Sequence, residues 1–155
     1  MSPASVAMSL LLLMAANGAP WLAGRFCRGW ANLPVDCSLT WPNGQRVLGS
    51  HKTWRGLLAA ILASAAVAEI LGLGLALGAR FGALAMAGDA FSSAIKRRQA
   101  TPPGTEVIGL DQMPEALLPL LLCARELQLG WPDILITTLL FMALDIGTAG
   151  LRQQR

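Results

Sequence analysis

Residues 81–98, which read FGALAMAGDAFSSAIKRR, decide the fold. The first part of this stretch is a run of small and apolar residues in which Asp89 is the only charge, and the stretch ends on the basic cluster Lys96, Arg97 and Arg98. A carboxylate at the centre of a membrane helix costs about 2.5–3.5 kcal/mol on insertion scales, so it is usually retained for a partner, an ion or a substrate. The stretch therefore predicts a membrane helix that carries a functional group and ends at a basic membrane boundary.

The composition of the whole chain also indicates a membrane protein. Of the 155 residues, 54% are hydrophobic and 14% are charged, whereas soluble domains carry about 25% charged residues. This composition excludes a disordered chain and a large soluble catalytic domain, and we expect one membrane-embedded domain over residues 1–155. The net charge is +3, but the basic residues lie beside apolar runs, so they indicate membrane topology rather than a nucleic-acid partner.

Five apolar runs predict an all-α polytopic membrane protein with about five transmembrane helices. At roughly 1.5 Å per residue, the longer runs can cross a bilayer core. No Lys or Arg precedes the first run, which favours a retained span over a cleaved signal peptide. The predicted spans are Val6–Ala23, Gly56–Ala79, Phe81–Ile95, Pro114–Leu122 with an extension to Leu129, and Ile134–Leu151.

The second predicted span contains three glycines, Gly72, Gly74 and Gly78. Their spacing superficially resembles a dinucleotide-binding fingerprint, but no strand precedes them. We interpret Gly74 and Gly78 as a small-residue surface for close helix packing. Arg80 is expected to mark a very short turn between the second and third spans.

The basic residues predict the orientation of the chain in the membrane. With the N-terminus outside, ten Lys and Arg residues lie on the inner side and two, Arg80 and Arg125, lie on the outer side. Such an excess of positive charge marks the cytoplasmic side. We therefore expect a multi-pass protein of the cytoplasmic membrane whose C-terminus and two polar loops, Gly24–Arg55 and Gln99–Gln112, face the cytoplasm, where nucleotides are available.

One face of the helix around Asp89 combines groups that suit a metal-bound polyphosphate. At 100° per residue, Ser92, Ser93 and Lys96 fall within about 60° of Asp89. This face would present a carboxylate, two hydroxyls and an ammonium to a ligand. The alternative is an internal ion pair between Asp89 and an arginine of a neighbouring helix.

Charged residues also gather at the ends of the two polar loops. Lys52 and Arg55 end the first loop and Asp111 lies near the end of the second. Two acids can hold Mg²⁺, several cations can hold phosphates, and apolar flanks can hold an acyl or prenyl chain, so a nucleotide and a lipid phosphate are the simplest substrate pair. The sequence has no Walker loop, so side chains would hold the triphosphate. Glu69 and Asp145 have no such cluster of charged residues beside them in the sequence, so we interpret each as part of an internal ion pair.

Several short motifs, in this order and at this spacing, resemble the CDP-archaeol synthase family, the small multi-span relatives of phosphatidate cytidylyltransferases. They cover about residues 16–115. The motifs are ANGAP at 16–20, PVD at 34–36, NGQRVLG at 43–49, KTWRG at 52–56, GDAFSSAIKRR at 88–98, PG at 103–104 and DQ at 111–112.

The resemblance implies a five-span helical enzyme that transfers a cytidylyl group from CTP to an isoprenoid or acyl glycerol phosphate, releases pyrophosphate and requires Mg²⁺. A lipid phosphate oxygen would attack the α-phosphorus of CTP in line, assisted by charge neutralisation. By this resemblance and the helix face above, the catalytic residues are Asp89, Asp111 and Lys96, with both acids as metal ligands, and the substrate-binding residues are Asn17, Lys52, Thr53, Arg55, Ser92, Ser93 and Arg97. Asp36 and Thr53 are expected to support the site.

The chain departs from the family pattern at one position. The family usually places a second aspartate three residues after the first, whereas this chain reads Asp111-Gln112-Met113-Pro114 and has Glu115 one position later. The longer side chain of Glu115 either replaces the missing acid or leaves the site without it. Two alternatives therefore stay open, a non-catalytic relative that binds lipid phosphate or nucleotide, and a small helical membrane scaffold.

Overall fold

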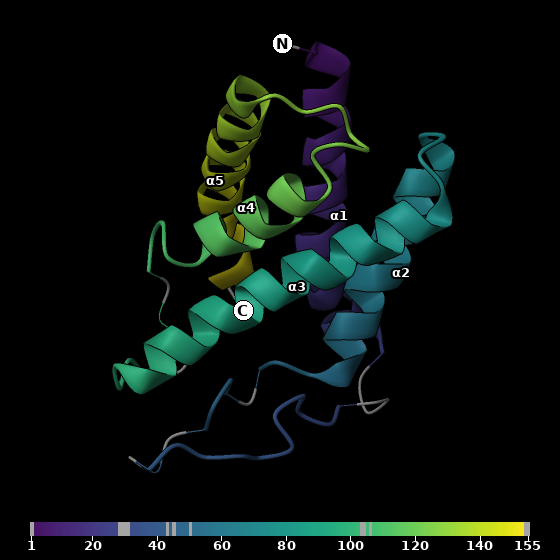
Figure 1. Cartoon of the computed structure of the whole chain (residues 1–155). Coiled ribbons are helices and arrows are strands. Elements are labelled where there is room, and N and C mark those ends of the chain that lie inside the picture. Colours follow the sequence, from purple (N-terminus) through teal and green to yellow (C-terminus); the bar gives the residue numbers. More distant parts are fainter. Residues whose placement is uncertain are drawn as a thin grey trace.

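Among the residues that it describes, the computed structural model has five helices and no other regular element (Figure 1). The structure describes residues 2–27, 32–42, 44, 46–49, 51–102, 105 and 107–153, with side chains up to residue 148. Some predicted features lie outside the described residues: positions 43 and 45 of the NGQRVLG motif, the PG motif at 103–104, and the basic residues Arg28 and Arg155 of the topology prediction. The helices are α1 (Pro3–Phe26), α2 (Trp54–Ile70), α3 (Leu75–Arg98), α4 (Gln112–Leu122) and α5 (Trp131–Gln153).

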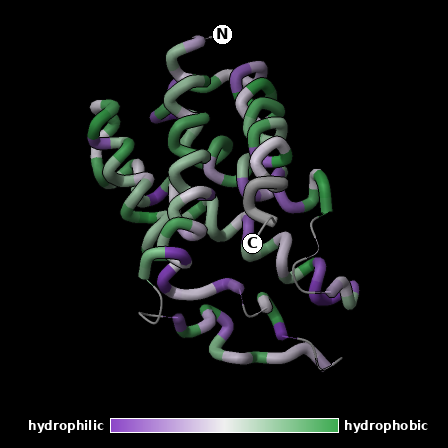
Figure 2. The backbone as a smooth tube through the Cα atoms, turned by 180° about the vertical axis from the view of Figure 1, so that it is seen from behind, coloured by the Kyte–Doolittle hydropathy of each residue, from purple (hydrophilic) through white to green (hydrophobic). Residues whose placement is uncertain are grey.

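Within the described part of the chain, two helices, α1 and α5, are by length and composition apolar enough to cross a membrane, over Pro3–Phe26 and Trp131–Thr148. The start of α1 follows from its sequence, because Ser2 caps the helix through a hydrogen bond from the backbone N–H of Ser5 and Pro3 occupies the first turn. The helices that the sequence predicts in these two regions are confirmed. Figure 2 shows hydrophobic residues along the helices and hydrophilic residues recurring along the loop at the bottom of the view.

The second predicted span breaks earlier than expected. A turn at residues 71–74 separates α2 from α3, and in it Gly72 and Gly74 have φ angles of +73° and +86°. Glycine adopts this left-handed conformation without the steric cost that side chains impose. The predicted continuous helix Gly56–Ala79 and the predicted turn at Arg80 are therefore wrong, because hydropathy does not register a backbone reversal made by glycines inside an apolar run.

Glycines do bring α2 and α3 together, but one helical turn later than expected. A Cβ on Gly78 would lie 2.4 Å from the carbonyl oxygen of Ser64, and a Cβ on Gly82 would lie 2.8 Å from that of Ala60. Because these neighbours are backbone atoms, neither position accepts a side chain without moving a helix. The small-residue packing surface is thus Gly78 and Gly82 rather than Gly74 and Gly78.

The fourth helix is shorter than expected. After α4 the chain turns between Cys123 and Leu129, so the predicted extension of the helix to Leu129 is wrong. Gln128 in this turn has a φ of +53°, a backbone conformation outside the α-helical region. The 11 residues of α4 measure about 17 Å at 1.5 Å per residue, less than the ~30 Å hydrocarbon core of a bilayer. α4 alone therefore does not cross a membrane.

α3 and α4 cross at Gly88, where a Cβ would lie 2.1 Å from the carbonyl oxygen of Pro114 and 2.8 Å from Cα of Glu115. We expect Gly88→Ala to lower the free energy of unfolding by about 1–3 kcal/mol, because the added methyl meets backbone on the facing helix. Gly147→Ala in α5 is the control, since nothing lies within 4 Å of a Cβ there. Unfolding in detergent measures both variants, and equal stability of the two would contradict this crossing.

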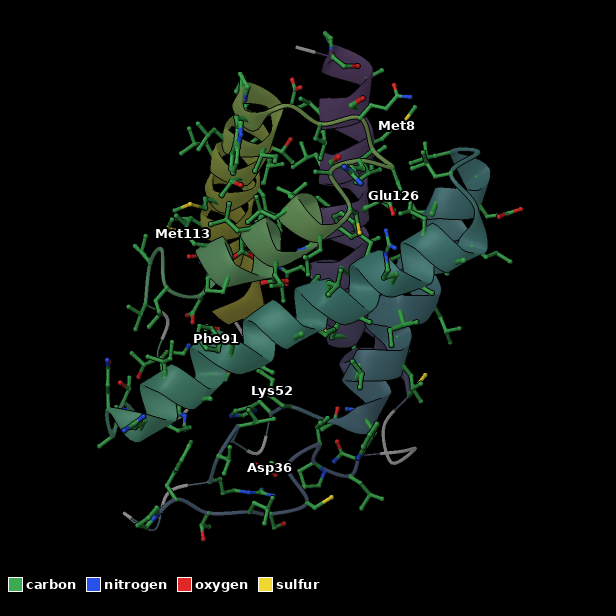
Figure 3. All side chains as sticks on the ribbon, viewed as in Figure 1. Met8, Asp36, Lys52, Phe91, Met113 and Glu126 are labelled. Atoms are coloured by element: carbon green, nitrogen blue, oxygen red, sulfur yellow. The ribbon has the colours of Figure 1, made fainter. Side chains whose placement is uncertain are left out.

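Arg80, which the sequence placed in a turn, lies in α3 and forms an ion pair with Glu126. Figure 3 labels Glu126 in the turn after α4. The hydrogen bond from the guanidinium lowers the pKa of the Glu126 carboxyl. A lowered pKa gives stability that is present above the unfolded-state value of about 4.3 and is lost as the pH falls through the folded-state value.

We therefore expect Glu126→Gln to reduce the acid-induced loss of stability below about pH 5, without a change near pH 7 in the slope of stability against pH. The effect is small because the pair is exposed. Melting temperatures measured across this pH range test it, with Glu69→Gln, an exposed acid at the end of α2, as the control. Indistinguishable acid profiles of wild type and Glu126→Gln would contradict the stabilising role of this pair.

Candidate functional site

One polar cavity of about 390 Å³ lies among four helices and the two polar loops. It contains most of the residues that the sequence predicts for the site, drawn from α1, the first loop, α3 and the second loop. Its lining residues are Asn17, Pro20, Trp21, Leu48, Gly49, His51, Lys52, Met86, Asp89, Ser93, Lys96, Arg97, Thr105, Asp111, Gln112, Glu115 and Asp145.

Asp89 is paired with Lys52, whose Nζ forms an ion pair with Oδ2 of Asp89, and both residues line the cavity. Two backbone hydrogen bonds hold the segment around Lys52 against residues 33–35 of the first loop. The carbonyl of Lys52 accepts the N–H of Val35 at 2.8 Å, and the N–H of Trp54 donates to the carbonyl of Leu33 at 3.0 Å. Figure 3 shows Lys52 on the segment that passes below α3 in this view. The internal ion pair considered for Asp89 therefore exists, with a lysine of the first loop in place of an arginine.

The second lysine–carboxylate pair is Lys96 with Asp111. Lys96 is buried in the last turn of α3 and also donates to the carbonyl of Thr105 at 3.1 Å. The other carboxylate oxygen of Asp111 accepts the N–H of Val107 at 3.0 Å. Both acids predicted to bind metal thus line the same cavity, and each has an ammonium beside it.

Arg97 brings a further cation to the cavity and is 6% exposed. Its two terminal nitrogens donate to the carbonyls of Thr101 at 2.5 Å and Pro102 at 3.1 Å. Its Nε is buried and has no hydrogen-bond partner among the residues the structure describes. A buried cationic donor without an acceptor costs free energy, so this N–H suits an anionic ligand in the cavity.

Three of the predicted substrate-binding residues lie outside this polar lining. Ser92 is fully buried and donates to the carbonyl of Asp89 at 2.9 Å. Thr53 caps α2 by accepting the N–H of Gly56 at 3.2 Å. Arg55 donates to the carbonyl of Cys27 at 2.9 Å. The structure gives these three side chains local structural contacts, and Thr53 also lines a neighbouring apolar cavity.

Asp36, the predicted supporting residue, is buried and organises the first loop. Its Oδ1 accepts the N–H of Ser38 at 3.0 Å and a nitrogen of Arg46 at 3.3 Å, and its Oδ2 accepts the N–H of Leu48 at 3.1 Å. Leu48 lines the cavity. Asp36 therefore organises the segment that leads to Lys52, and its supporting role in the site stays a prediction.

The polar cavity residues outside the predicted site are His51, Thr105, Gln112, Glu115 and Asp145, of which the sequence analysis considered only Glu115 for the site, as an alternative acid. Glu115 is buried in the first turn of α4, and its position one helical turn after Asp111 is a signal that the sequence offered. Gln112 lies between them in sequence, also buried. Asp145 comes from α5 and accepts hydrogen bonds from Asn17 and Gln112; its distance in sequence from the motifs gave no such signal.

A second, apolar cavity of about 300 Å³ adjoins the polar one. The two cavities share six lining residues, among them Lys52 and Asp89, and its apolar walls include Val35, Leu57 and Ala87. A charged chamber and an apolar chamber therefore meet at the Lys52–Asp89 ion pair. This arrangement suits a ligand with an anionic head and an apolar chain.

The carboxylates of the polar cavity fit Mg²⁺ only together with other ligands. Among the described residues, no three His, Cys, Asp or Glu side chains are grouped closely enough to hold a metal by themselves. Mg²⁺ is commonly bound by one or two carboxylates together with substrate phosphates and water. Asp89, Asp111 and Glu115 all line the cavity, so this donor set fits an ion that takes part of its ligands from a bound phosphate.

Comparisons with known proteins agree with this picture. No family model matches the chain. The chain is 33% identical over 107 aligned residues to the CDP-archaeol synthase of Pyrococcus furiosus, and the match covers 63% of this chain and 60% of that protein. It is 35% identical over 127 residues to that of Thermofilum pendens, with 73% and 59% covered, and 36% identical over 110 residues to that of Aeropyrum pernix, with 67% and 60% covered.

The chain thus spans about 60% of the length of the curated relatives it matches. It is also similar to a solved structure described as an intramembrane enzyme for archaeal membrane lipid biosynthesis. That match has a TM-score of 0.75 and 28% identity, and covers 92% of this chain and 90% of the other. The chain is therefore similar in sequence to the CDP-archaeol synthases and in fold to an intramembrane lipid-biosynthesis enzyme, and the resemblance that its motifs predict is confirmed.

Proposed function

We propose that the chain is a membrane cytidylyltransferase that transfers CMP from CTP to a lipid phosphate, giving a CDP-lipid and pyrophosphate. The observation that carries the proposal is the junction of the two cavities at Lys52 and Asp89. One side of this junction offers cations and carboxylates for a nucleotide triphosphate. The other side offers an apolar wall for a lipid chain.

The nucleotide side rests on the buried cations of α3. Lys96 and Arg97 lie in the same polar cavity as the acids Asp89, Asp111 and Glu115. The two cations would bind phosphate oxygens, and the unpartnered Nε of Arg97 would find an acceptor there. The acids would hold Mg²⁺, which when bound would neutralise part of the negative charge on the phosphates of CTP during transfer of the CMP group.

The acceptor side rests on the apolar cavity. Small and branched apolar residues such as Val35, Leu57 and Ala87 line it, and an acceptor chain against them would bring its phosphate to Lys52. These walls would accept either an isoprenyl or an acyl glycerol phosphate, because neither chain needs a polar partner.

The reaction requires little covalent chemistry from the protein. An oxygen of the acceptor phosphate forms a bond to the α-phosphorus of CTP while the bond from that phosphorus to the bridging oxygen breaks, and pyrophosphate leaves with the electron pair. The attacking oxygen is already anionic, so the step needs alignment and charge neutralisation rather than a general base. Lys52, Lys96 and Arg97 would supply both.

The same proposal places the chain in the cytoplasmic membrane as a multi-pass protein, with its N-terminus outside. The two long apolar helices support insertion in a membrane, and the excess of basic residues near the polar loops supports this orientation. The polar cavity would then open toward the side that holds CTP. Labelling of single cysteines from either side of sealed vesicles tests the orientation, and labelling of the first loop only from outside would contradict it.

Membranes that contain the protein, incubated with labelled CTP, Mg²⁺ and a panel of ether-linked and ester-linked lipid phosphates, test the function. The proposal predicts a labelled CDP-lipid with one pyrophosphate released for each product, and no product after chelation of Mg²⁺. CTP binding without pyrophosphate release would instead indicate a non-catalytic relative. No product and no protection by CTP against thermal unfolding would contradict any nucleotide-dependent function and favour a scaffold.

A further inference from the structure

Asp145 of α5 lies in the polar cavity and has no part in the transfer described above. Its Oδ1 accepts a hydrogen bond from Nδ2 of Asn17 on α1 at 2.8 Å. Its Oδ2 accepts one from Nε2 of Gln112 on α4 at 3.0 Å. The two oxygens of one carboxylate therefore each meet an amide group from a different helix.

These contacts fix which way both amides face. A carboxylate only accepts hydrogen bonds, so Asn17 and Gln112 must both turn their NH₂ groups toward Asp145. This orientation directs Oε1 of Gln112 to the chain before α4, where it accepts the N–H of Gly109 at 2.9 Å. The next residue back from Gln112 is Asp111, whose carboxylate accepts the N–H of Val107.

We propose that Asp145 is a positioning residue for Asp111. By orienting the amide of Gln112, Asp145 holds the turn at residues 107–111 in the shape that presents the Asp111 carboxylate to the cavity. The effect on catalysis rests on the proposed function, whereas the effect on the turn does not.

Asparagine at position 145 is the informative substitution because it changes the donors and acceptors and keeps the shape. It has one acceptor and one donor, so its NH₂ group would face the NH₂ group of either Asn17 or Gln112. If Gln112 turns over to avoid this, the N–H of Gly109 loses its acceptor. The double variant Asp145→Asn with Gln112→Glu reverses the donor and acceptor between the two residues, and so restores every one of these hydrogen bonds at the same net charge.

Asp133 provides a matched control on the same helix. It is a buried aspartate, and its two oxygens accept the N–H groups of Ser2 at 3.2 Å and Gly130 at 3.0 Å. It is not among the residues that line the polar cavity. Asp133→Asn therefore removes the same kind of acceptor from α5 without touching the amides in the cavity.

The experiment measures backbone hydrogen exchange over residues 107–112 and kcat/KM for CTP in the full-length chain. We expect Asp145→Asn to speed exchange in this segment about tenfold and to lower kcat/KM about 10- to 100-fold. Asp133→Asn should change neither hydrogen exchange over residues 107–112 nor kcat/KM, apart from the effect of a general loss of stability. The double variant should return both quantities toward their wild-type values.

Unchanged exchange over 107–112 in Asp145→Asn would overturn the proposal, and so would a double variant no better than the single one. If Asp145→Asn alone fails to fold, the double variant decides. A folded double variant supports the proposal, because it restores the hydrogen bonds with donor and acceptor reversed, and an unfolded double variant overturns the proposal. If the wild-type chain makes no CDP-lipid, the proposed function fails, while the exchange measurements still decide whether Asp145 holds the turn.

Discussion

Asp89→Asn is expected to lower kcat/KM for CMP transfer by about 10³-fold, because removing charge stabilisation from a phosphoryl-transfer site costs several kcal/mol. The amide has the shape of the carboxylate but carries no charge for a cation. Lys52, the partner of Asp89, is partly exposed to solvent, so the fold tolerates the loss of the ion pair. We expect a small change in melting temperature beside a large loss of turnover.

Product formation from labelled CTP at several Mg²⁺ concentrations measures this effect. The variant should also need more Mg²⁺ than wild type to reach half of its own maximal rate, since one ligand of the ion is weakened. Glu69→Gln, which changes an exposed acid at the end of α2, is the control and should keep wild-type turnover. Wild-type kcat/KM in Asp89→Asn would remove this carboxylate from the mechanism.

Lys96→Met is expected to lower kcat/KM by about 10²–10³-fold, because it removes a fixed cation from the site where negative charge develops. Lys96 is 9% exposed and contacts both Asp111 and the carbonyl of Thr105. Methionine keeps much of the apolar stem, so packing is largely retained. The loss of the ammonium also leaves Asp111 without its counter-charge, which should lower stability as well.

Arg98→Met separates a specific effect from a general loss of positive charge. Arg98 lies in the same last turn of α3 but is exposed and does not line the cavity. Calorimetric CTP binding and turnover should be nearly unchanged in Arg98→Met, whereas Lys96→Met should weaken both. Equal losses in the two variants would indicate a nonspecific electrostatic effect.

Much of the site follows from the sequence because its charges lie on α3 and in the two polar loops, each within a short motif. Asp89, Ser93 and Lys96 share one helix face at spacings of three and four residues, and the structure keeps them together. Ser92 falls inside the same angular window but points into the packed interior. At 100° per residue the two serines lie on opposite sides of Asp89, about 60° and about 40° from it, and helical periodicity does not tell which side faces the cavity.

The parts that could not be predicted depend either on contacts between distant segments or on a backbone conformation that hydropathy does not register. Asp145 meets Asn17 across 128 residues of sequence, and neither local sequence predicts the other. The break between α2 and α3 depends on positive φ angles at Gly72 and Gly74, which an apolar run does not reveal. The place of Glu115 in the cavity depends on how α4 crosses α3 at Gly88.

A double-mutant cycle on Asp89 and Asp111 tests most directly whether both carboxylates act on one ion. The measurement is kcat/KM for CMP transfer at saturating Mg²⁺ in wild type, Asp89→Asn, Asp111→Asn and the double variant. If the acids share one ion, the double variant is scarcely slower than the slower single variant, because residues that act as a unit are non-additive. Losses that multiply would contradict a shared site and show that the two carboxylates act independently.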